Sequence, residues 1–236
     1  MRKRLSLLGY IVAVIGVAFL VAGAVAYTRV QDGYGSLQAF SEAQDVQLSY
    51  NEDGQLTDRG TTEGADAIMA TLRDDWKYPV VESDLDSNDP LVNTGTEYMF
   101  QMATVSFHVL HGTQTVVLDE QVEYNGEVFE PGTYEFEVEG KYWTDFDRQH
   151  PIEGPARAQA WSGTVHGLIG ELGVGTVTHS TLQMGLALAA LYAGIGATLI
   201  LTGGGLAFAM RAKEDFGIPD TVPESFIREG DVEASV

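Results

Sequence analysis

The sequence predicts an α+β protein in which two membrane-spanning helices flank one folded, acidic domain. Residues 7–27 and 182–210 contain no Asp, Glu, Lys or Arg, and a helix of roughly 20 apolar residues can cross a bilayer. The roughly 150 residues between these runs suffice for one domain with its own core. We therefore expect four parts: residues 1–27 with the first span, the domain at 28–181, the second span at 182–210, and a tail at 211–236.

Charge placement predicts the orientation of the two spans. Residues 1–27 carry three bases and no acid, residues 28–181 carry 27 acids and 7 bases, and the tail carries 7 acids and 3 bases, which gives the net charge of -21. Lys and Arg close to a span tend to stay on the cytoplasmic side. Because such bases lie at residues 2–4 and at Arg211 and Lys213, we expect a multi-pass protein of the cell membrane with both termini cytoplasmic.

The first apolar run also admits a second interpretation. Ala24-Val25-Ala26 follows a basic start and fits the small-residue cleavage site of a signal peptide. The apolar core of a signal peptide usually has about 7 to 15 residues, whereas this run is longer. Its length favours an uncleaved membrane anchor, and cleavage is the alternative.

The acidity of the domain limits its partners. The 27 acids and 7 bases of residues 28–181 give a charge of -20, which is unsuited to nucleic acid and to anionic lipid surfaces. Basic proteins or divalent cations fit better, and the alternative is that acidity serves solubility or a high-salt environment. The chain contains no cysteine, so it has neither a disulfide nor a lipid-modified Cys anchor. We expect no cofactor.

Small side chains recur along both apolar runs and predict that the two spans pack together. They recur every seven residues in the first run and every four in the second. Small residues let helix backbones approach closely in lipid, where burying apolar area drives no association. We expect an intramolecular helix pair or a homo-oligomer interface, and the alternative is that Gly and Ala are common in any membrane helix. The packing residues predicted in this way are Gly9, Gly16, Gly23, Gly185, Ala189 and Ala193.

In the first half of the domain the patterns predict mainly helices and turns. We expect a short helix at 34–44, a short strand at 46–50 and a turn at 51–54. Apolar residues of 63–76 recur at the spacing of an amphipathic helix. Residues 78–90, which contain two prolines, are expected to form a loop.

In the second half the patterns predict an antiparallel β-meander. Residues 99–110 are rich in β-branched and aromatic side chains, and 113–118 follow as a strand after a turn at His111-Gly112. Asn125-Gly126 supplies the two positive φ angles of a two-residue hairpin turn within 122–129.

The meander is expected to have one wet, acidic face. Pro131-Gly132 fits the centre of a type II turn, and apolar residues then alternate with Glu over 134–139. A helix is expected at 155–172, ended by the glycines at 173 and 175. The tail is expected to be disordered.

Several segments also carry a resemblance. The run Tyr124-Asn125-Gly126-Glu127-Val128-Phe129, with Gly132-Thr133-Tyr134, Tyr142-Trp143-Thr144-Asp145-Phe146-Asp147-Arg148 and Gly154-Pro155-Ala156-Arg157-Ala158-Gln159-Ala160-Trp161, resembles actinobacterial two-pass membrane proteins of uncharacterised function. The resemblance covers the length of the chain, including both spans. It implies an acidic extracytoplasmic domain in a bacterial envelope, and it implies no chemistry.

One acidic segment has the opening of a calcium loop. Asp84, Asp86 and Asn88 show the D-x-D-x-N spacing of its oxygen ligands. Asp89 stands where an EF-hand requires Gly, and Gly95 stands where it requires Glu, so an EF-hand is excluded. A looser divalent-cation site remains a hypothesis, and the alternative is an Asp-rich turn.

The histidines supply two further hypotheses. His108 and His111 have a spacing that could bind zinc on a helix, but on the predicted strand and turn they point to opposite faces. His150, His166 and His179 could share a site or act as a pH switch. Solvated or capping histidines are the alternative.

Aromatic and charged residues gather between the predicted meander and the following helix. Because Trp, Tyr and Arg dominate interface hot spots, we predict a binding surface at Tyr142, Trp143, Asp145, Phe146 and Arg148. The same aromatic residues would also serve as the core that fixes the domain above the spans, and this structural interpretation is preferred.

The absence of common catalytic and transport motifs restricts the classes of function that we expect. The sequence has no G-x-S-x-G elbow and no phosphate-binding Gly loop, and the predicted spans lack the ionisable side chains that mark ion pathways. We therefore expect an extracytoplasmic interaction or accessory module without catalytic activity, whose partners are the lipid bilayer and other envelope proteins. The alternatives are an envelope enzyme that uses dispersed acids and His, and a small pore or transporter subunit.

Overall fold

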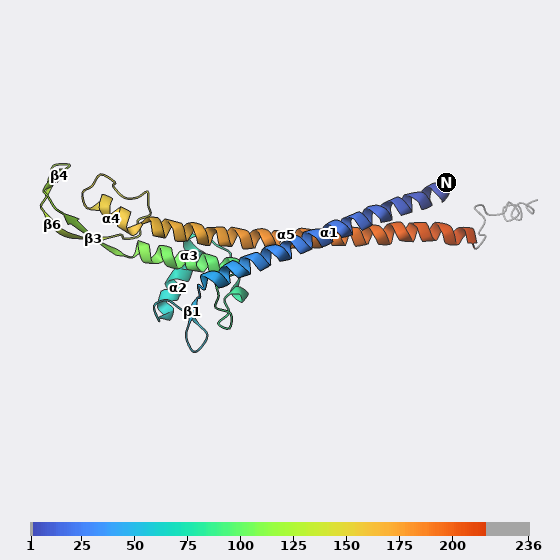
Figure 1. Ribbon diagram of the computed structural model, residues 1–236, viewed down its shortest axis with the longest axis horizontal. Helices are drawn as coiled ribbons and strands as arrows, with labels where there is room; N and C mark the ends of the chain where they lie inside the picture. Colours follow the sequence, from blue (N-terminus) through green and yellow to red (C-terminus); the bar gives the residue numbers. More distant parts are fainter. Residues whose placement is uncertain (1, 216–236) are drawn as a thin grey trace, which may run out of the picture. The chain divides into compact units, whose positions relative to one another are not determined.

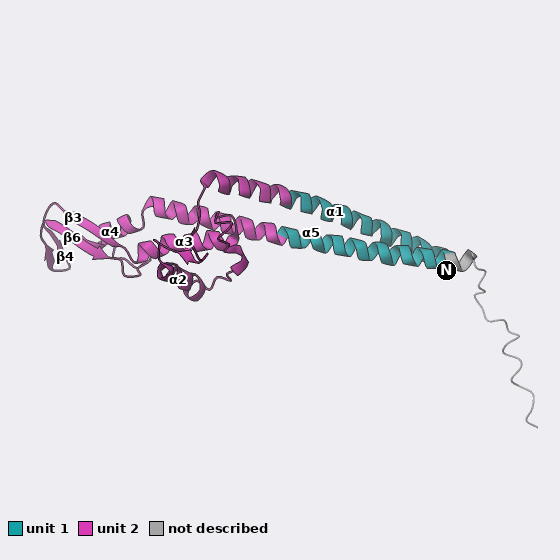
Figure 2. Ribbon diagram, turned by 90° about the horizontal axis from the view of Figure 1, so that it is seen from below, with its two compact units in different colours: residues 1–30, 185–236 teal, residues 31–184 magenta. Residues whose placement is uncertain are grey.

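Two long helices begin and end the part of the chain that the structure, a computed structural model, describes, namely residues 2–215. They are α1 (Arg2–Gln44), blue in Figure 1, and α5 (Gly163–Asp215), orange to red in Figure 1. By length and composition each helix can cross a membrane, which suggests a membrane protein. The chain divides into unit 1, with residues 1–30 and 185–236, and unit 2, with residues 31–184 (Figure 2).

In unit 1 the two helices pack antiparallel through small residues. A Cβ atom at Gly16 would lie 2.7 Å from the carbonyl oxygen of Gly196, which shows how closely the backbones approach. The seven-residue spacing of the α1 glycines keeps them on the face toward the partner helix. The contacts run in opposite directions along the helices, from Gly9 on Gly203 through Gly16 on Gly196 to Gly23 on Ala189.

The helix predicted at 34–44 is confirmed as helical, but it is not a separate element, because α1 continues without a break to Gln44. Gly33 does not end it, since the Leu182 side chain of α5 occupies the space beside that glycine. The last turns of α1 bury Leu37 and Ser41 in unit 2. Contacts with the rest of unit 2 therefore stabilise residues 33–44 of α1, where the glycines make the sequence a weak helix former.

The next segment of unit 2 follows the predictions. Strands β1 (Ser49–Tyr50) and β2 (Leu56–Thr57) pair around a turn in which the Asn51 side chain accepts hydrogen bonds from the backbone. The amphipathic helix predicted at 63–76 is confirmed as α2 (Thr62–Ala70), which continues into the π-helical turn η1 (Thr71–Asp75). The predicted loop contains one 3-10 turn, η2 (Glu82–Asp84).

The strand expected in 99–110 is wrong, because these residues belong to helix α3 (Gly95–Leu110). Thr94 and Glu97 form a capping box, in which each side chain accepts a hydrogen bond from the other residue's backbone N–H. This S/T-x-x-E pattern stabilises a helix start. The buried residues then recur every three positions, as Glu97, Phe100, Ala103, Ser106 and Val109.

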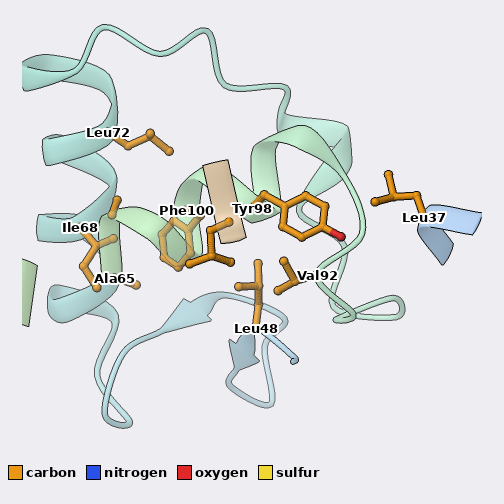
Figure 3. Packing of buried hydrophobic residues seen from close by; sticks show 10 residues of the cluster. Leu37, Leu48, Ala65, Ile68, Leu72, Val92, Tyr98 and Phe100 are labelled. Carbon is orange, nitrogen blue, oxygen red and sulfur yellow. The ribbon is translucent and has the colours of Figure 1, made fainter. Parts of the chain in front are cut away.

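The main core of unit 2 lies among α2, α3 and the end of α1. Ile68 of α2 and Leu72 of η1 are fully buried in the same cluster as Phe100 of α3. Figure 3 shows Tyr98 of α3 beside Val92, with Leu37 of α1 on the side of its hydroxyl group. The members of this core are apolar side chains, so apolar burial at roughly 25 cal/mol per Å² is its main source of stability.

The antiparallel pairing predicted for the strands is confirmed, but the strand order of a meander is wrong, because residues 113–137 form one interrupted hairpin. Strand β3 (Thr113–Leu118) pairs with β6 (Gly132–Glu137), and β4 (Val122–Tyr124) pairs with β5 (Glu127–Phe129) between them. Leu118 faces Gly132 and Val122 faces Phe129, so three residues on one side oppose two on the other, as in a bulge. Pro131 lies in this interruption, and because proline has no backbone N–H it cannot donate a hydrogen bond between the strands there.

The turns of this hairpin give one confirmation and one correction. Asn125 and Gly126 have φ angles of 50° and 84°, so the predicted two-residue turn is confirmed. The type II turn at Pro131-Gly132 is wrong, because Gly132 is the first residue of β6 and has no positive φ. The predicted alternation is confirmed: Tyr134, Phe136 and Val138 point inward and the intervening Glu residues are exposed.

The helix predicted at 155–172 is divided in two. Helix α4 (Glu153–Ala160) ends at Trp161, and the Ser162 hydroxyl accepts a hydrogen bond from the Val165 N–H at the start of α5. The expected break at Gly173 and Gly175 is wrong, since α5 continues through both. α5 also includes Arg211–Asp215, and the rest of the predicted disordered tail lies outside the described residues.

Candidate interaction site

A pocket of about 100 Å³ opens on unit 2 where three helices meet. The last turn of α1, the middle of α3 and the first turns of α5 line it, together with the loop residues Val46 and Val92. The two loops that contain these residues are joined, because the Val92 N–H donates a hydrogen bond to the carbonyl oxygen of Val46 at 2.9 Å. The pocket is therefore built from segments that the sequence separates by more than a hundred positions.

Helical spacing explains why each helix contributes one face to the pocket. Tyr98, Gln101 and Val105 of α3 lie at positions i, i+3 and i+7, which share a face. On α5, Leu168 and Glu171 lie three residues apart on one face. The capping box fixes where α3 begins. Residues 98, 101 and 105 of α3 then share the face that lines the pocket.

The floor of the pocket is a buried hydrogen bond between Ser41 of α1 and Tyr98 of α3. Their hydroxyl oxygens are 2.7 Å apart, and both side chains are buried. The Tyr98 ring also lies against Gly175 of α5, where a Cβ atom would be 2.6 Å from ring carbons. The two hydroxyls pair with each other, and most of the lining side chains are apolar, so the pocket favours an apolar group.

The rim of the pocket is apolar and acidic. Phe40, Val46 and Leu168 are large apolar side chains at 42%, 37% and 42% exposure. Glu171 is the charged residue of the lining, and the lining contains no Lys or Arg. Exposed apolar residues around a small pocket are typical of a protein interaction site.

The residues predicted to form a binding surface at 142–148 do not form one exposed patch. Phe146 is buried, and Trp143 is half-buried, with the Arg157 guanidinium 3.0 Å from its ring centroid. Asp145 accepts a hydrogen bond from the Tyr142 N–H, and Arg148 is exposed. These contacts are those of a loop that holds α4.

Further aromatic contacts tie the same loop to the rest of unit 2. The Tyr142 ring stacks on Trp161, and its hydroxyl accepts a hydrogen bond from the Trp76 indole at 3.1 Å. The Trp161 indole donates to the carbonyl oxygen of Lys141, whose ammonium group pairs with Glu153. The contacts support the structural interpretation of this segment.

The residues predicted as a divalent-cation site are engaged with each other or with neighbours. The Asp86 carboxylate accepts hydrogen bonds from the backbone and the side chain of Asn88, both at 2.9 Å, which closes an Asx turn. Asp84 lies in η2 and its charge acts on His179. In residues 2–215, no group of three or more His, Cys, Asp or Glu side chains is arranged to hold a metal ion.

The histidines occupy separate places. His108, on α3, bonds the Asp58 carboxylate at 2.9 Å, and His111 caps the same helix through the Phe107 carbonyl oxygen. His150 accepts backbone hydrogen bonds at the start of α4, and His166 packs edge-on against Trp143. Burial lowers the pKa of His179, and the Asp84 carboxylate partly opposes this shift.

Sequence reasoning missed two buried acidic groups. Burial raises the pKa of Glu97, although hydrogen bonds from Asn93 and Thr94 act in the opposite direction. Burial, followed by the nearby Glu97 carboxylate, raises the pKa of Tyr50 to about 12. The capping pattern Thr94-x-x-Glu97 is the sequence signal that indicates helix α3.

The comparisons with known proteins add no relative: no family model, no curated protein and no solved structure matches the chain.

Proposed function

We propose that the protein is a membrane-anchored interaction module of a bacterial cell envelope. In this proposal α1 and α5 cross the membrane, both termini are cytoplasmic, and unit 2 lies outside as an acidic domain that binds another envelope protein. The observation that carries the binding role is the apolar pocket of unit 2, with its exposed rim at Phe40, Val46 and Leu168.

The surface of unit 1 supports the membrane part of this proposal. Its large apolar side chains are exposed rather than buried in a protein core, with Val14 at 68%, Leu201 at 76% and Phe208 at 74%. Soluble proteins rarely expose an apolar surface of this kind, because contact with water is unfavourable. A bilayer removes this cost, and the bases at residues 2–4 and at Arg211 favour a cytoplasmic position for both ends.

Photo-crosslinking in the native membrane tests the binding role. A photo-reactive phenylalanine analogue in place of Phe40 should form a discrete adduct with another protein, because this position lies on the pocket rim. The adduct should be strongly reduced in a second variant that also carries Leu168→Asp.

Val117 supplies the matched control, because this strand residue is also exposed and apolar but lies outside the pocket lining. The same analogue at Val117 should give no such adduct. If neither position gives a protein adduct, or both give the same adducts, the proposed role of the pocket is wrong.

A further inference from the structure

We infer that the pocket of unit 2 binds one apolar side chain of a partner protein, and that the partner segment carries Lys or Arg beside this side chain. This inference rests on the proposed function and specifies the chemistry of the partner. The size of the pocket indicates that a single side chain binds in it. The acidic residues around the pocket indicate that the neighbouring residues of the partner are basic.

The size of the pocket fits a single side chain. A volume of about 100 Å³ has room for about three water molecules, whereas small-molecule sites usually measure about 300–1,000 Å³. A volume of this size matches one side chain such as Leu, Met or Phe rather than a whole cofactor or lipid molecule. Filling such a pocket with one apolar anchor is how hot-spot residues bind.

The surroundings of the pocket select a basic partner. Glu171 lies in the lining, and Glu42 and Asp45 lie exposed at the end of α1. No Lys or Arg occurs in residues 30–58, in α3, or in residues 158–210. A basic segment would therefore meet acids and no opposing base on the parts of the three helices that line the pocket, and such complementarity governs which partner binds.

A peptide selection on the purified full-length protein in detergent tests this inference. The probe is a phage-displayed library of random peptides. The selected peptides should contain one large apolar residue with Lys or Arg next to it. In a synthetic peptide of this kind, replacing the apolar residue by Ala should weaken binding by about tenfold or more.

Two charge variants of the protein form a matched pair. Glu171→Lys reverses the charge at the pocket and should weaken binding of the same peptide by about tenfold or more. Glu127→Lys makes the same change at an exposed position on β5 and should leave binding unchanged. Both positions are exposed, and equal melting temperatures of the two variants establish that neither effect comes from unfolding.

The inference is overturned if no peptide is selected, if the selected peptides lack basic residues, or if the two variants bind equally. A lipid molecule found attached to the photo-reactive analogue at Phe40 also overturns it. The proposed function can fail separately: basic peptides that bind at the pocket, without a protein adduct in the native membrane, support this inference and contradict the interaction role in the cell.

Discussion

Gly16→Leu is expected to destabilise the helix pair of unit 1 by about 1–3 kcal/mol or more, the usual cost of overpacking a close contact. A Cβ atom at Gly16 would lie 2.7 Å from the Gly196 carbonyl oxygen and 2.8 Å from the Ile200 nitrogen. Because both are backbone atoms, a side-chain rotation cannot relieve the clash. The helices must separate, and the midpoint of thermal unfolding in detergent, followed by far-UV circular dichroism, should fall by several degrees.

Adjacent residues supply the controls for this substitution. Val17→Leu changes an exposed side chain and should alter the free energy of unfolding by no more than about 0.5 kcal/mol. On the partner helix, Gly203→Ala should be destabilising and Gly204→Ala should not, because a Cβ at Gly203 would lie 2.5 Å from the Gly9 carbonyl oxygen and one at Gly204 meets nothing within 4 Å. Equal effects of Gly16→Leu and Val17→Leu would mean that the small residues do not hold the helices together.

Gly175→Ala is expected to destabilise unit 2 by about 1–3 kcal/mol, although Gly→Ala in a helix normally stabilises by about 0.5–1 kcal/mol. The new Cβ would lie 2.6 Å from carbons of the Tyr98 ring. The ring cannot move away freely, because it is buried and its hydroxyl bonds Ser41 at 2.7 Å. Since Tyr98 also forms the pocket floor, the same substitution should weaken binding at the pocket.

Gly170→Ala in the same helix is the matched control, because a Cβ at Gly170 meets no atom within 4 Å. Gly170→Ala should raise the free energy of unfolding by about 0.5–1 kcal/mol, the usual gain for Gly→Ala in a helix. Intrinsic fluorescence can follow both variants, since Trp76, Trp143 and Trp161 all lie in unit 2. A melting temperature of Gly175→Ala at or above that of the parent would contradict the close packing of Tyr98 on α5.

Local rules predicted the parts of the fold that depend on neighbouring residues. Asn125-Gly126 determines its turn through two positive φ angles, and the alternation of apolar residues with Glu over 134–139 predicts one buried and one exposed face. The prediction of a strand in 99–110 is wrong because β-branched and aromatic residues such as Val105 and Phe107 favour strands on average, whereas this segment is helical. In α3 the capping box and burial at every third position outweigh that preference.

Tertiary contacts determined the parts that the sequence could not predict. Glycines usually weaken a helix, so a break at Gly175 was expected, but the residue is needed there because Tyr98 occupies the space of a side chain. The pocket is likewise formed by Phe40, Tyr98 and Leu168, which belong to three different helices. No pattern within one segment of the sequence indicates that these residues meet.

The central claim, that both helices cross the membrane and hold unit 2 outside, is tested most directly by thiol labelling in intact, wall-permeable cells. The chain has no native cysteine, so single substitutions give unique reporters. A cysteine at Glu127, which is exposed on β5, should react with a membrane-impermeant maleimide, and one at Ser235 should react only after the membrane is permeabilised. Labelling of both positions in intact cells, or labelling at Ser235 alone, would contradict the proposed topology.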